Sequence, residues 1–270
     1  MKNRRTTRYI KKGSHGTLEW AVKSVNCCTG CSHDCRYCFA KEMGIRFGWA
    51  TAGLWPLEQI RQKDVDKIYK KYDGQVMFPS SHDITPNNLN GCLTALRCLI
   101  IVGNRMLVVS KPHFECIKAF CEMFRPYRRR ILLRFSIGAC DDRILSYWEP
   151  NAPSYDERKK CLMHAYQHGF KTSVSVEPML DSGGIDALIC DLSPYVTHSI
   201  WLGTMNHLKR FEKHADAVLK EAIEAVRVGQ TDEIIKAIYR RYKNDPMIRW
   251  KKEIKKVVGI PIPKQNGLDK

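Results

Sequence analysis

Five of the twelve cysteines in this 270-residue chain fall within one stretch, Cys27-Cys28-Thr29-Gly30-Cys31-Ser32-His33-Asp34-Cys35-Arg36-Tyr37-Cys38-Phe39-Ala40. Within it, Cys31, Cys35 and Cys38 have the spacing C-x3-C-x2-C. Thiolates are the usual protein ligands of iron–sulfur clusters. Three thiolates on one short loop suit three irons of a 4Fe–4S cubane, and the fourth iron then keeps an open position. The stretch therefore predicts a cluster that binds a substrate or cofactor as well as accepting electrons.

Two other metal sites fit the same stretch. The pairs Cys28–Cys31 and Cys35–Cys38 each have the C-x2-C spacing found in zinc sites. Zinc pairs are normally separated by a longer loop than the three residues present here, so this alternative requires an unusually tight knuckle. A ferredoxin-like cluster, with Cys27 or Cys28 as the fourth ligand, is the second alternative. The sequence assigns these two cysteines no other role.

Strand and helix patterns alternate along the chain after the cysteine stretch. We expect strands at residues 75–78, 106–110, 131–137, 171–176 and 198–202. We expect helices between them, at residues 57–72, 91–102, 113–123, 156–168 and 184–192. This alternation predicts an α/β fold with a parallel sheet or open barrel and helices outside it. In such folds ligands bind where the strands end, which points to residues 79–83, 110–111, 136–142, 177–178 and 203–206.

The chain is divided by its charge pattern into three parts: a basic N-terminal arm at 1–24, a core at 25–210 and a basic extension at 211–270. Within the extension, helices are expected at 217–226 and 233–242. Lys and Arg total 45 against 28 Asp and Glu, a formal net charge of +17. Such an excess favours a polyanionic partner, DNA or RNA, although a basic surface without a nucleic-acid partner has the same composition.

The apolar stretches of the chain are short. None approaches the roughly 18 residues of a membrane span, so no membrane partner is expected. The first residues are basic and no apolar run follows them, which argues against a secretory signal and for a cytoplasmic protein. In that compartment cysteines are free thiols or metal ligands rather than disulfides.

Several segments, taken in order, resemble the spore photoproduct lyase-like subgroup of the radical SAM superfamily. They are the cysteine loop at 31–39, PSSHDI at 79–84, VSK at 109–111, RFSI at 134–137 and WEPNAPS at 148–154, followed by Arg158, Gly169 and 174–178. The resemblance covers about residues 25–180. It implies a partial (β/α)6 TIM-like barrel with a C-terminal helical extension, in which S-adenosylmethionine (SAM) binds a 4Fe–4S cluster at the top of the barrel.

The resemblance also implies roles for residues at the strand ends. Lys111 would pair with the SAM carboxylate, and Ser136 would hydrogen-bond SAM. Ser81 and Asp83 occupy the place of the segment that holds the SAM amino group in other members. Each has a structural alternative: a solvated strand-end lysine, a simple strand serine, or a turn in which Asp83 caps the following segment.

One position departs from the subgroup. The lyase has a cysteine hydrogen-atom donor immediately before its Ser/Thr-Asp segment, and the matching residue here is Ser80. A hydroxyl hydrogen is much harder to abstract than a thiol hydrogen, so Ser80 cannot take this role. Cys140 is the candidate for a relocated donor, with an unreactive thiol as the alternative. Tyr37 is a candidate radical relay, with packing on the cluster as its alternative.

We therefore predict a lyase-like or modifying radical SAM enzyme that cleaves SAM reductively and uses the 5′-deoxyadenosyl radical to abstract hydrogen. It needs an external one-electron reductant of the flavodoxin or ferredoxin type. A nucleic acid is the first candidate substrate. A peptide or small molecule is the alternative with the same chemistry, and a non-enzymatic basic Fe–S or zinc nucleic-acid-binding module is the alternative without it.

Overall fold

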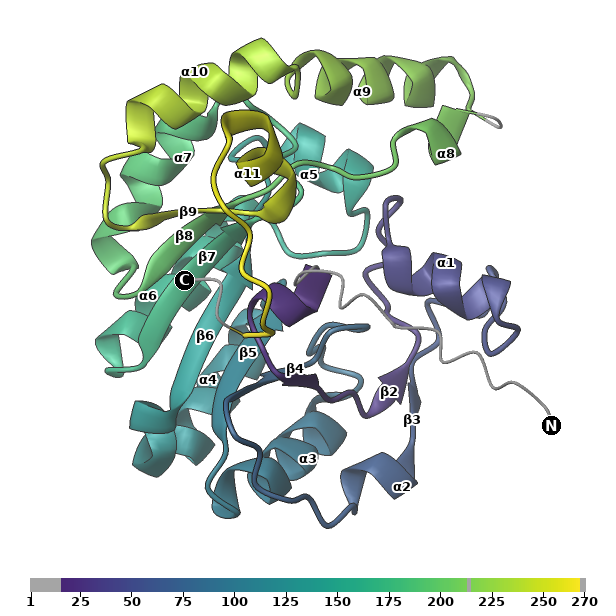
Figure 1. Ribbon diagram of the computed structural model, residues 1–270. Coiled ribbons are helices and arrows are strands. Elements are labelled where there is room, and N and C mark those ends of the chain that lie inside the picture. Colours follow the sequence, from purple (N-terminus) through teal and green to yellow (C-terminus); the bar gives the residue numbers. More distant parts are fainter. Residues whose placement is uncertain (1–15, 213–214, 268–270) are drawn as a thin grey trace, which may run out of the picture.

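The computed structural model describes residues 16–212 and 215–267, and a curved sheet of seven parallel strands forms its centre (Figure 1). Neighbouring strands follow the order of the chain, and every pair is parallel. The strands are β1 (Lys23–Ser24), β4 (Gln75–Phe78), β5 (Arg105–Ser110), β6 (Ile131–Ser136), β7 (Lys171–Val176), β8 (Ser199–Leu202) and β9 (Ile248–Trp250). Because all seven run in one direction, their carboxyl ends lie at the same edge of the sheet.

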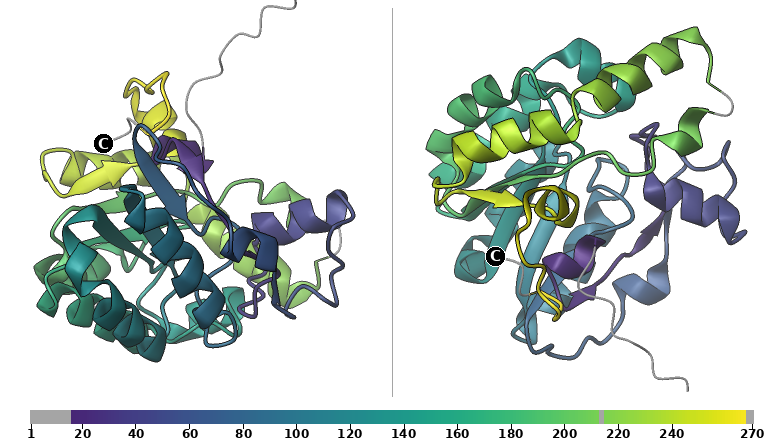
Figure 2. Two further views of the ribbon diagram at one scale, coloured as in Figure 1. Left: turned by 90° about the horizontal axis from the view of Figure 1, so that it is seen from below. Right: turned by 45° about the horizontal axis from the view of Figure 1, so that its top comes forward.

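Helices cover the outer face of this sheet (Figures 1 and 2). Those between the central strands are α3 (Leu89–Ile101), α4 (Phe114–Phe124), α5 (Asp142–Trp148), α6 (Tyr155–Gln167) and α7 (Ile185–Leu192). Ser154 caps the start of α6, and its Oγ accepts a hydrogen bond from the Glu157 amide at 3.3 Å. The helix is followed by Gly169 at φ 72°, the left-handed conformation that glycine adopts without strain at a helix end.

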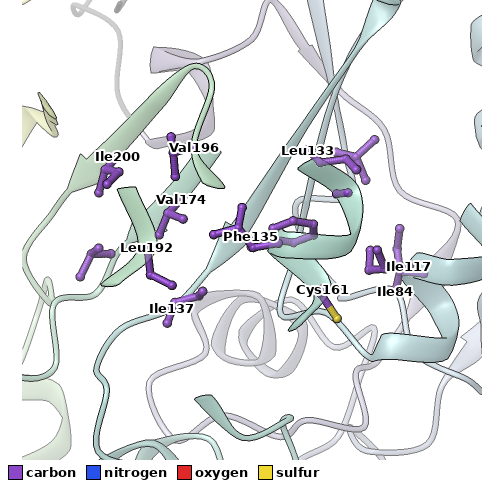
Figure 3. Close-up of a cluster of buried hydrophobic side chains, with 14 of the residues drawn as sticks. Ile84, Ile117, Leu133, Phe135, Ile137, Cys161, Val174, Leu192, Val196 and Ile200 are labelled. Atoms are coloured by element: carbon purple, nitrogen blue, oxygen red, sulfur yellow. The ribbon is translucent and has the colours of Figure 1, made fainter. Parts of the chain in front are cut away.

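The main hydrophobic core lies between the sheet and these helices. Side chains of a strand alternate between its two faces, so every second residue reaches this core. Figure 3 shows Leu133 and Phe135 of β6, Val174 of β7 and Leu192 of α7 in this core. The residues between them face the inside of the barrel, where a smaller apolar cluster contains Trp20, Ala21, Met77, Leu107, Leu132 and Trp201.

The five strands expected from the sequence are present to within one residue at each end. The prediction of a helix at 57–72 is wrong. This region forms β3 (Gln59–Ile60), paired antiparallel with β2 (Cys28–Thr29), and then only one turn, α2 (Gln62–Val65). Its apolar residues do not share one face, since Val65 is buried whereas Ile68 is 95% exposed. Pairing with the cysteine stretch therefore replaces the helix.

The predicted extension contributes to the sheet as well as to the helical layer. Helices α9 (Ala217–Val228) and α10 (Asp232–Tyr242) lie where helices were expected, and α8 (Lys209–Glu212) and α11 (Lys252–Val258) flank them. Strand β9 follows α10 and pairs with β8, which the sequence analysis missed. The residue after β9 is the buried Lys251. Its Nζ lies 3.0 Å from Oε1 of the buried Glu19 in η1 (Gly16–Glu19). This ion pair joins the extension to the start of the described chain.

The predicted N-terminal arm lies mostly outside the described residues, which begin at Gly16. Its remaining part forms η1 and β1 and brings Trp20 into the barrel. None of the helices in the described part of the chain combines the length and the apolar character that crossing a membrane requires.

Candidate active site

Most of the predicted site residues meet at the carboxyl edge of the sheet. One cavity of about 320 Å³ is lined by the three thiols and by side chains from the loops that follow the strands. The predicted residues in its wall are Cys31, Cys35, Tyr37, Cys38, Ser81, Asp83, Lys111 and Ser136. They come from separate segments of the chain, so only the fold brings them together.

The cysteine loop is held by backbone hydrogen bonds. The Cys31 amide donates to the Trp55 carbonyl at 2.9 Å. Gly30 before it has φ 88°, and a Cβ there would lie 2.6 Å from the same carbonyl, so a glycine is required. Cys38 caps helix α1 (Phe39–Arg46), and its Sγ accepts a hydrogen bond from the Lys41 amide at 3.4 Å. A thiolate at Cys38 is therefore favoured by the positive end of the helix.

All three thiols are largely shielded from solvent within the protein, and burial raises the pKa of Cys31, Cys35 and Cys38. The carboxylate of Asp83 raises the Cys31 pKa further, whereas the charge of Lys111 opposes the shift in the Cys35 pKa. Without a metal these side chains are neutral thiols. A bound metal centre would supply the positive charge that deprotonates them.

The separation of the three thiols tests the zinc alternative. Zinc–sulfur bonds are about 2.3 Å long, so two thiolates on one zinc ion lie within about 4.6 Å of each other. Among the described residues, two sets of three ligand atoms lie within 4.8 Å of one another: Cys27, His82 and Cys92, and Cys31, His33 and Asp83. Cys31, Cys35 and Cys38 do not form such a set. As placed, the three sulfur atoms are therefore not a ready set of ligands for one zinc ion.

Asp83 is the centre of the polar side of the cavity. Its Oδ1 accepts hydrogen bonds from the Lys111 amide at 2.8 Å and from Ser110 Oγ at 3.1 Å. Its Oδ2 lies 2.8 Å from Nδ1 of the buried His33. Burial raises the Asp83 pKa, but Lys111 and His33 outweigh it and leave the pKa well below its usual range. Asp83 is therefore a carboxylate, and its side-chain hydrogen bonds join it to Ser110, Lys111 and His33 rather than to the segment that follows it.

Lys111 lies between two carboxylates. Its Nζ is 3.6 Å from Asp83 Oδ2 and 3.9 Å from Glu149 Oε1. Burial lowers the Lys111 pKa, but the negative charges around it, led by Asp83, raise it well above its ordinary value. It is not a solvated strand-end lysine, because its side chain is only 13% exposed. A charged ammonium is thus held at the wall of the cavity.

A second buried network lies behind Lys111, and no role was expected for it from the sequence. The Tyr37 hydroxyl donates to Oε1 of Glu149, and Oε2 of Glu149 lies 2.6 Å from Nη1 of Arg158. Arg158 also donates to the carbonyls of Ser136, at 3.2 Å, and Pro153, at 2.8 Å. Glu149 was visible in the WEPNAPS segment, but its partner Tyr37 is far away in sequence. The network fixes Tyr37, whose pKa burial raises well above its ordinary value.

Cys27 and Cys28 lie behind the cavity and do not line it. Their amides both donate to Nε2 of His82, at 3.3 Å each. Cys27 Sγ lies 3.7 Å from Cys92 Sγ in the core. A fourth ligand from either residue, as the ferredoxin alternative requires, is not brought to the other three thiols.

Cys140 is not brought to the site either. It is half-buried after β6 and lines neither the thiol cavity nor the larger cavity next to it. It lies beside Tyr155, whose hydroxyl donates to Asp191 at 2.5 Å. Ser80 does line both cavities, and its Oγ accepts from Asn26 Nδ2 at 3.0 Å.

The larger cavity opens beside the thiols and has a volume of about 820 Å³. Several residues line both this cavity and the thiol cavity, among them Tyr37, Phe39, Ser80, Ser81 and Glu177. The outer wall of the larger cavity carries the acidic Glu253 together with aromatic and basic side chains, which are Phe39, Trp49, His207, Arg210, Lys252 and Lys256. Phe39 and Trp49 are 61% and 47% exposed, so their rings are available to a ligand.

Sequence comparison finds a distant relative. No protein-family model matches the chain. The chain is 24% identical over 183 residues to an uncharacterised protein of Acidianus two-tailed virus, a match that covers 63% of this chain. The chain spans about 60% of the length of that relative.

Comparison of structures finds the same fold in two enzymes. A spore photoproduct lyase variant with bound AdoMet and dinucleoside spore photoproduct has a TM-score of 0.57 and 16% identity, and the match covers 90% of this chain and 79% of that one. SuiB of Streptococcus suis, bound to S-adenosylmethionine, has a TM-score of 0.54 and 11% identity, covering 90% and 53%. The predicted fold class is confirmed: the chain has the partial barrel fold of these radical SAM enzymes.

Proposed function

We propose that this chain is a radical SAM enzyme, in which Cys31, Cys35 and Cys38 hold a 4Fe–4S cluster and the adjoining cavity binds SAM. The observation that carries the proposal is that these three thiols line one cavity with Lys111 and Asp83. When bound, the cluster and SAM supply one-electron cleavage of SAM to methionine and a 5′-deoxyadenosyl radical.

The residues present fit this cofactor pair. The three sulfur atoms do not all lie within 4.8 Å of one another, as ligands of one zinc ion would, and the start of α1 favours a negative charge on Cys38. Lys111 lines the cavity as a mostly buried ammonium and suits the SAM carboxylate, because charge-assisted hydrogen bonds are stronger than those between neutral groups. Asp83 is ionised and suits the SAM amino group, and Ser81 and Ser136 offer hydroxyls in the same wall.

The surrounding side chains orient these groups and exclude water. Glu149 keeps Lys111 and Tyr37 in place through the contacts described above. Trp20, Trp55 and Met77 supply the apolar part of the wall and are nearly inaccessible to solvent. A dry wall protects a reactive radical from side reactions. Tyr37 is itself held by Glu149, and a relay role through it stays a prediction.

The substrate we propose is a nucleic acid. The larger cavity beside Ser80 presents exposed Phe39 and Trp49 together with Arg210, Lys252 and Lys256. Aromatic rings on which bases stack and cations that track phosphates are the usual combination in single-strand binding sites. The net charge of +17 supports the same class, and the structurally similar lyase was solved with a dinucleoside ligand.

An external flavodoxin- or ferredoxin-type protein would supply the electron. All twelve cysteines are free thiols in the structure, and we propose a reducing compartment such as the cytoplasm for this protein. Cys140 lies away from both cavities, so we do not assign it the hydrogen-donor role.

The test is anaerobic reconstitution with iron and sulfide, reduction with dithionite, and detection of 5′-deoxyadenosine from SAM by mass spectrometry, with and without DNA or RNA. We expect product from the wild type, more product with the right nucleic acid, and none from the Cys31→Ala/Cys35→Ala/Cys38→Ala variant. The matched control is Cys190→Ala, an exposed thiol outside the site. Product from the triple variant would refute the cluster assignment. Product that no nucleic acid stimulates would favour a peptide or small molecule as substrate.

A further inference from the structure

A second large cavity lies at the opposite end of the barrel from the thiols, and the proposed function makes no use of it. Its volume is about 700 Å³. It is lined by residues at the starts of strands, including Gln75 of β4, Arg105 of β5 and Lys171 of β7. Because the strands are parallel, these residues lie at the amino edge of the sheet, and the thiols lie at the carboxyl edge.

This amino-edge cavity is strongly basic. Five arginines and one lysine line it: Arg105, Arg129, Arg130, Arg134, Lys171 and Arg249. Among the described lining residues, Asp73 is the only acidic one. Like charges collected around one cavity repel one another, so the arrangement favours an anion between them.

Arg134 is the innermost of these cations. It lies on β6, faces the barrel interior and is only 2% exposed. Its guanidinium lies 4.3 Å from the centre of the Trp20 ring and 5.2 Å from that of Trp201. Its Nε donates to Ser173 Oγ at 3.0 Å, but its buried Nη1 has no hydrogen-bond partner in the described part of the chain. A buried charged donor without a partner is costly, which points to a missing acceptor.

The pKa values of Arg134 and His198 are both lowered, as expected for groups buried beside several cations. Burial lowers the pKa of Arg134 to about 9, and the charge of Glu177 only partly opposes the shift. Burial also lowers the pKa of His198 to about 4, and the charges of Arg134, Lys171 and Arg249 lower it further. His198 is therefore neutral at pH 7, mainly because it is buried, and the three neighbouring cations add to the shift in its pKa.

We propose that the amino-edge cavity binds a phosphate-bearing anion, with one phosphate on the free Nη1 of Arg134 and the rest of its charge on Arg105 and Arg130. Arginine forks match the geometry of phosphate oxygens. Six cations around one cavity suit several negative charges rather than one carboxylate. The volume lies in the range of small-molecule sites, which is larger than an inorganic ion needs.

The site is also closed in part by the end of the described chain. Gln265, Asn266 and Gly267, in the yellow C-terminal segment of Figure 1, line the same cavity. The Gly267 amide donates to the Leu18 carbonyl at 2.8 Å, which holds this segment beside η1. Trp20 lines both this cavity and the thiol cavity, so its ring is the wall between the two ends of the barrel.

The first test is isothermal titration of the reconstituted full chain with pyrophosphate and with ATP. We expect saturable binding, and we expect Arg105→Gln/Arg130→Gln to raise the dissociation constant at least about tenfold, as loss of one good charge contact does. The matched control is Arg97→Gln/Arg240→Gln, which removes the same charge from the exposed surfaces of α3 and α10. Its dissociation constant should stay within about twofold of the wild type.

Arg105 and Arg130 form the rim of the cavity, and Arg105→Gln/Arg130→Gln is the rim variant. Arg134→Lys tests the inner contact separately, because it keeps the positive charge and removes the guanidinium that would bind two phosphate oxygens. We expect a loss of pyrophosphate affinity with an unchanged circular dichroism spectrum. If this variant does not fold, the rim variant and its control still decide the matter.

A single-stranded oligonucleotide, titrated in competition with pyrophosphate, identifies the source of the phosphate. If the oligonucleotide binds and pyrophosphate does not, and if the rim variant weakens this binding while the control variant does not, the cavity is a phosphate site that takes a nucleic-acid backbone. Equal losses in rim and control variants, or no binding of any probe, would overturn the proposal. These measurements need no SAM cleavage, so they are independent of the proposed function.

Discussion

Removing the guanidinium of Arg158 is the sharpest test of the network behind the cavity. Arg158 and Glu149 are 0% and 2% exposed, and their charged atoms are 2.6 Å apart. Arg158→Met leaves the Glu149 carboxylate buried, with Lys111 3.9 Å away as the remaining cation. Breaking a buried pair by removing one partner costs about 3–5 kcal/mol. We expect a loss of this size in the free energy of unfolding, measured by urea denaturation.

The double variant Arg158→Met/Glu149→Gln is the companion measurement. The amide that replaces the Glu149 carboxylate carries no charge but still accepts the hydrogen bond from Tyr37, so the double variant should recover part of the loss. Arg143→Met is the matched control, because Arg143 forms an exposed pair with Asp141 and should show a much smaller effect. A loss below about 1 kcal/mol for Arg158→Met, or none recovered by the double variant, would show that the pair is not the stabilising element described here.

Three further outcomes are expected. Lys111→Gln should weaken SAM binding by about 10- to 100-fold in equilibrium dialysis, because a hydrogen bond to a charged group contributes about 1.5–3 kcal/mol; unchanged affinity would remove Lys111 from the SAM site. Gly30→Ala should reduce the number of irons bound per chain after reconstitution, because its Cβ would meet the Trp55 carbonyl. Gly48→Ala is the control, since Gly48 also has a positive φ, 70°, but a Cβ there has no neighbour within 4 Å, and this variant should bind as much iron as the wild type. Equal iron in the two variants would contradict the packing argument. The wild type should lose stability as the pH falls from about 6.5 to about 4, because the unfolded chain binds a proton at His198 that the folded chain does not, its pKa being lowered by burial. His198→Asn should flatten this dependence in urea denaturation at pH 7 and pH 5, and an unchanged slope would count against it.

The core strands could be predicted because their signal is local. Apolar and β-branched residues at 131–136 or 171–176 specify a buried strand wherever it lies. The helix predicted at 57–72 failed because the strand partner of Ile60 is Cys28, 32 positions earlier in the chain. Strand β9 was missed because it has three residues with Arg249 in the middle, which reads as part of a charged segment until β8 lies beside it.

The candidate site divides in the same way. The spacing of Cys31, Cys35 and Cys38 is a local pattern, so the sequence alone predicts the cluster loop. Parallel strands then place Asp83, Lys111 and Ser136 at one edge, which topology predicts without any distances. The separation of Cys140 from the cavities depends on how the loop after β6 packs, and no pattern in the sequence encodes it.

The sequence by itself determined the α/β alternation, the cluster loop, the strand-end residues and the excess of positive charge, because each depends only on residues close together in the chain or on the overall composition. Only the tertiary structure decided which groups meet: Asp83 with His33, Glu149 with Arg158, and Arg134 between Trp20 and Trp201. An arginine inside an apolar strand looks unfavourable in the sequence. Whether this arginine is stabilised depends on aromatic rings and cations from distant segments of the chain. Electrostatic energy is set by the distance between charges in space and by their burial, not by their positions in the sequence.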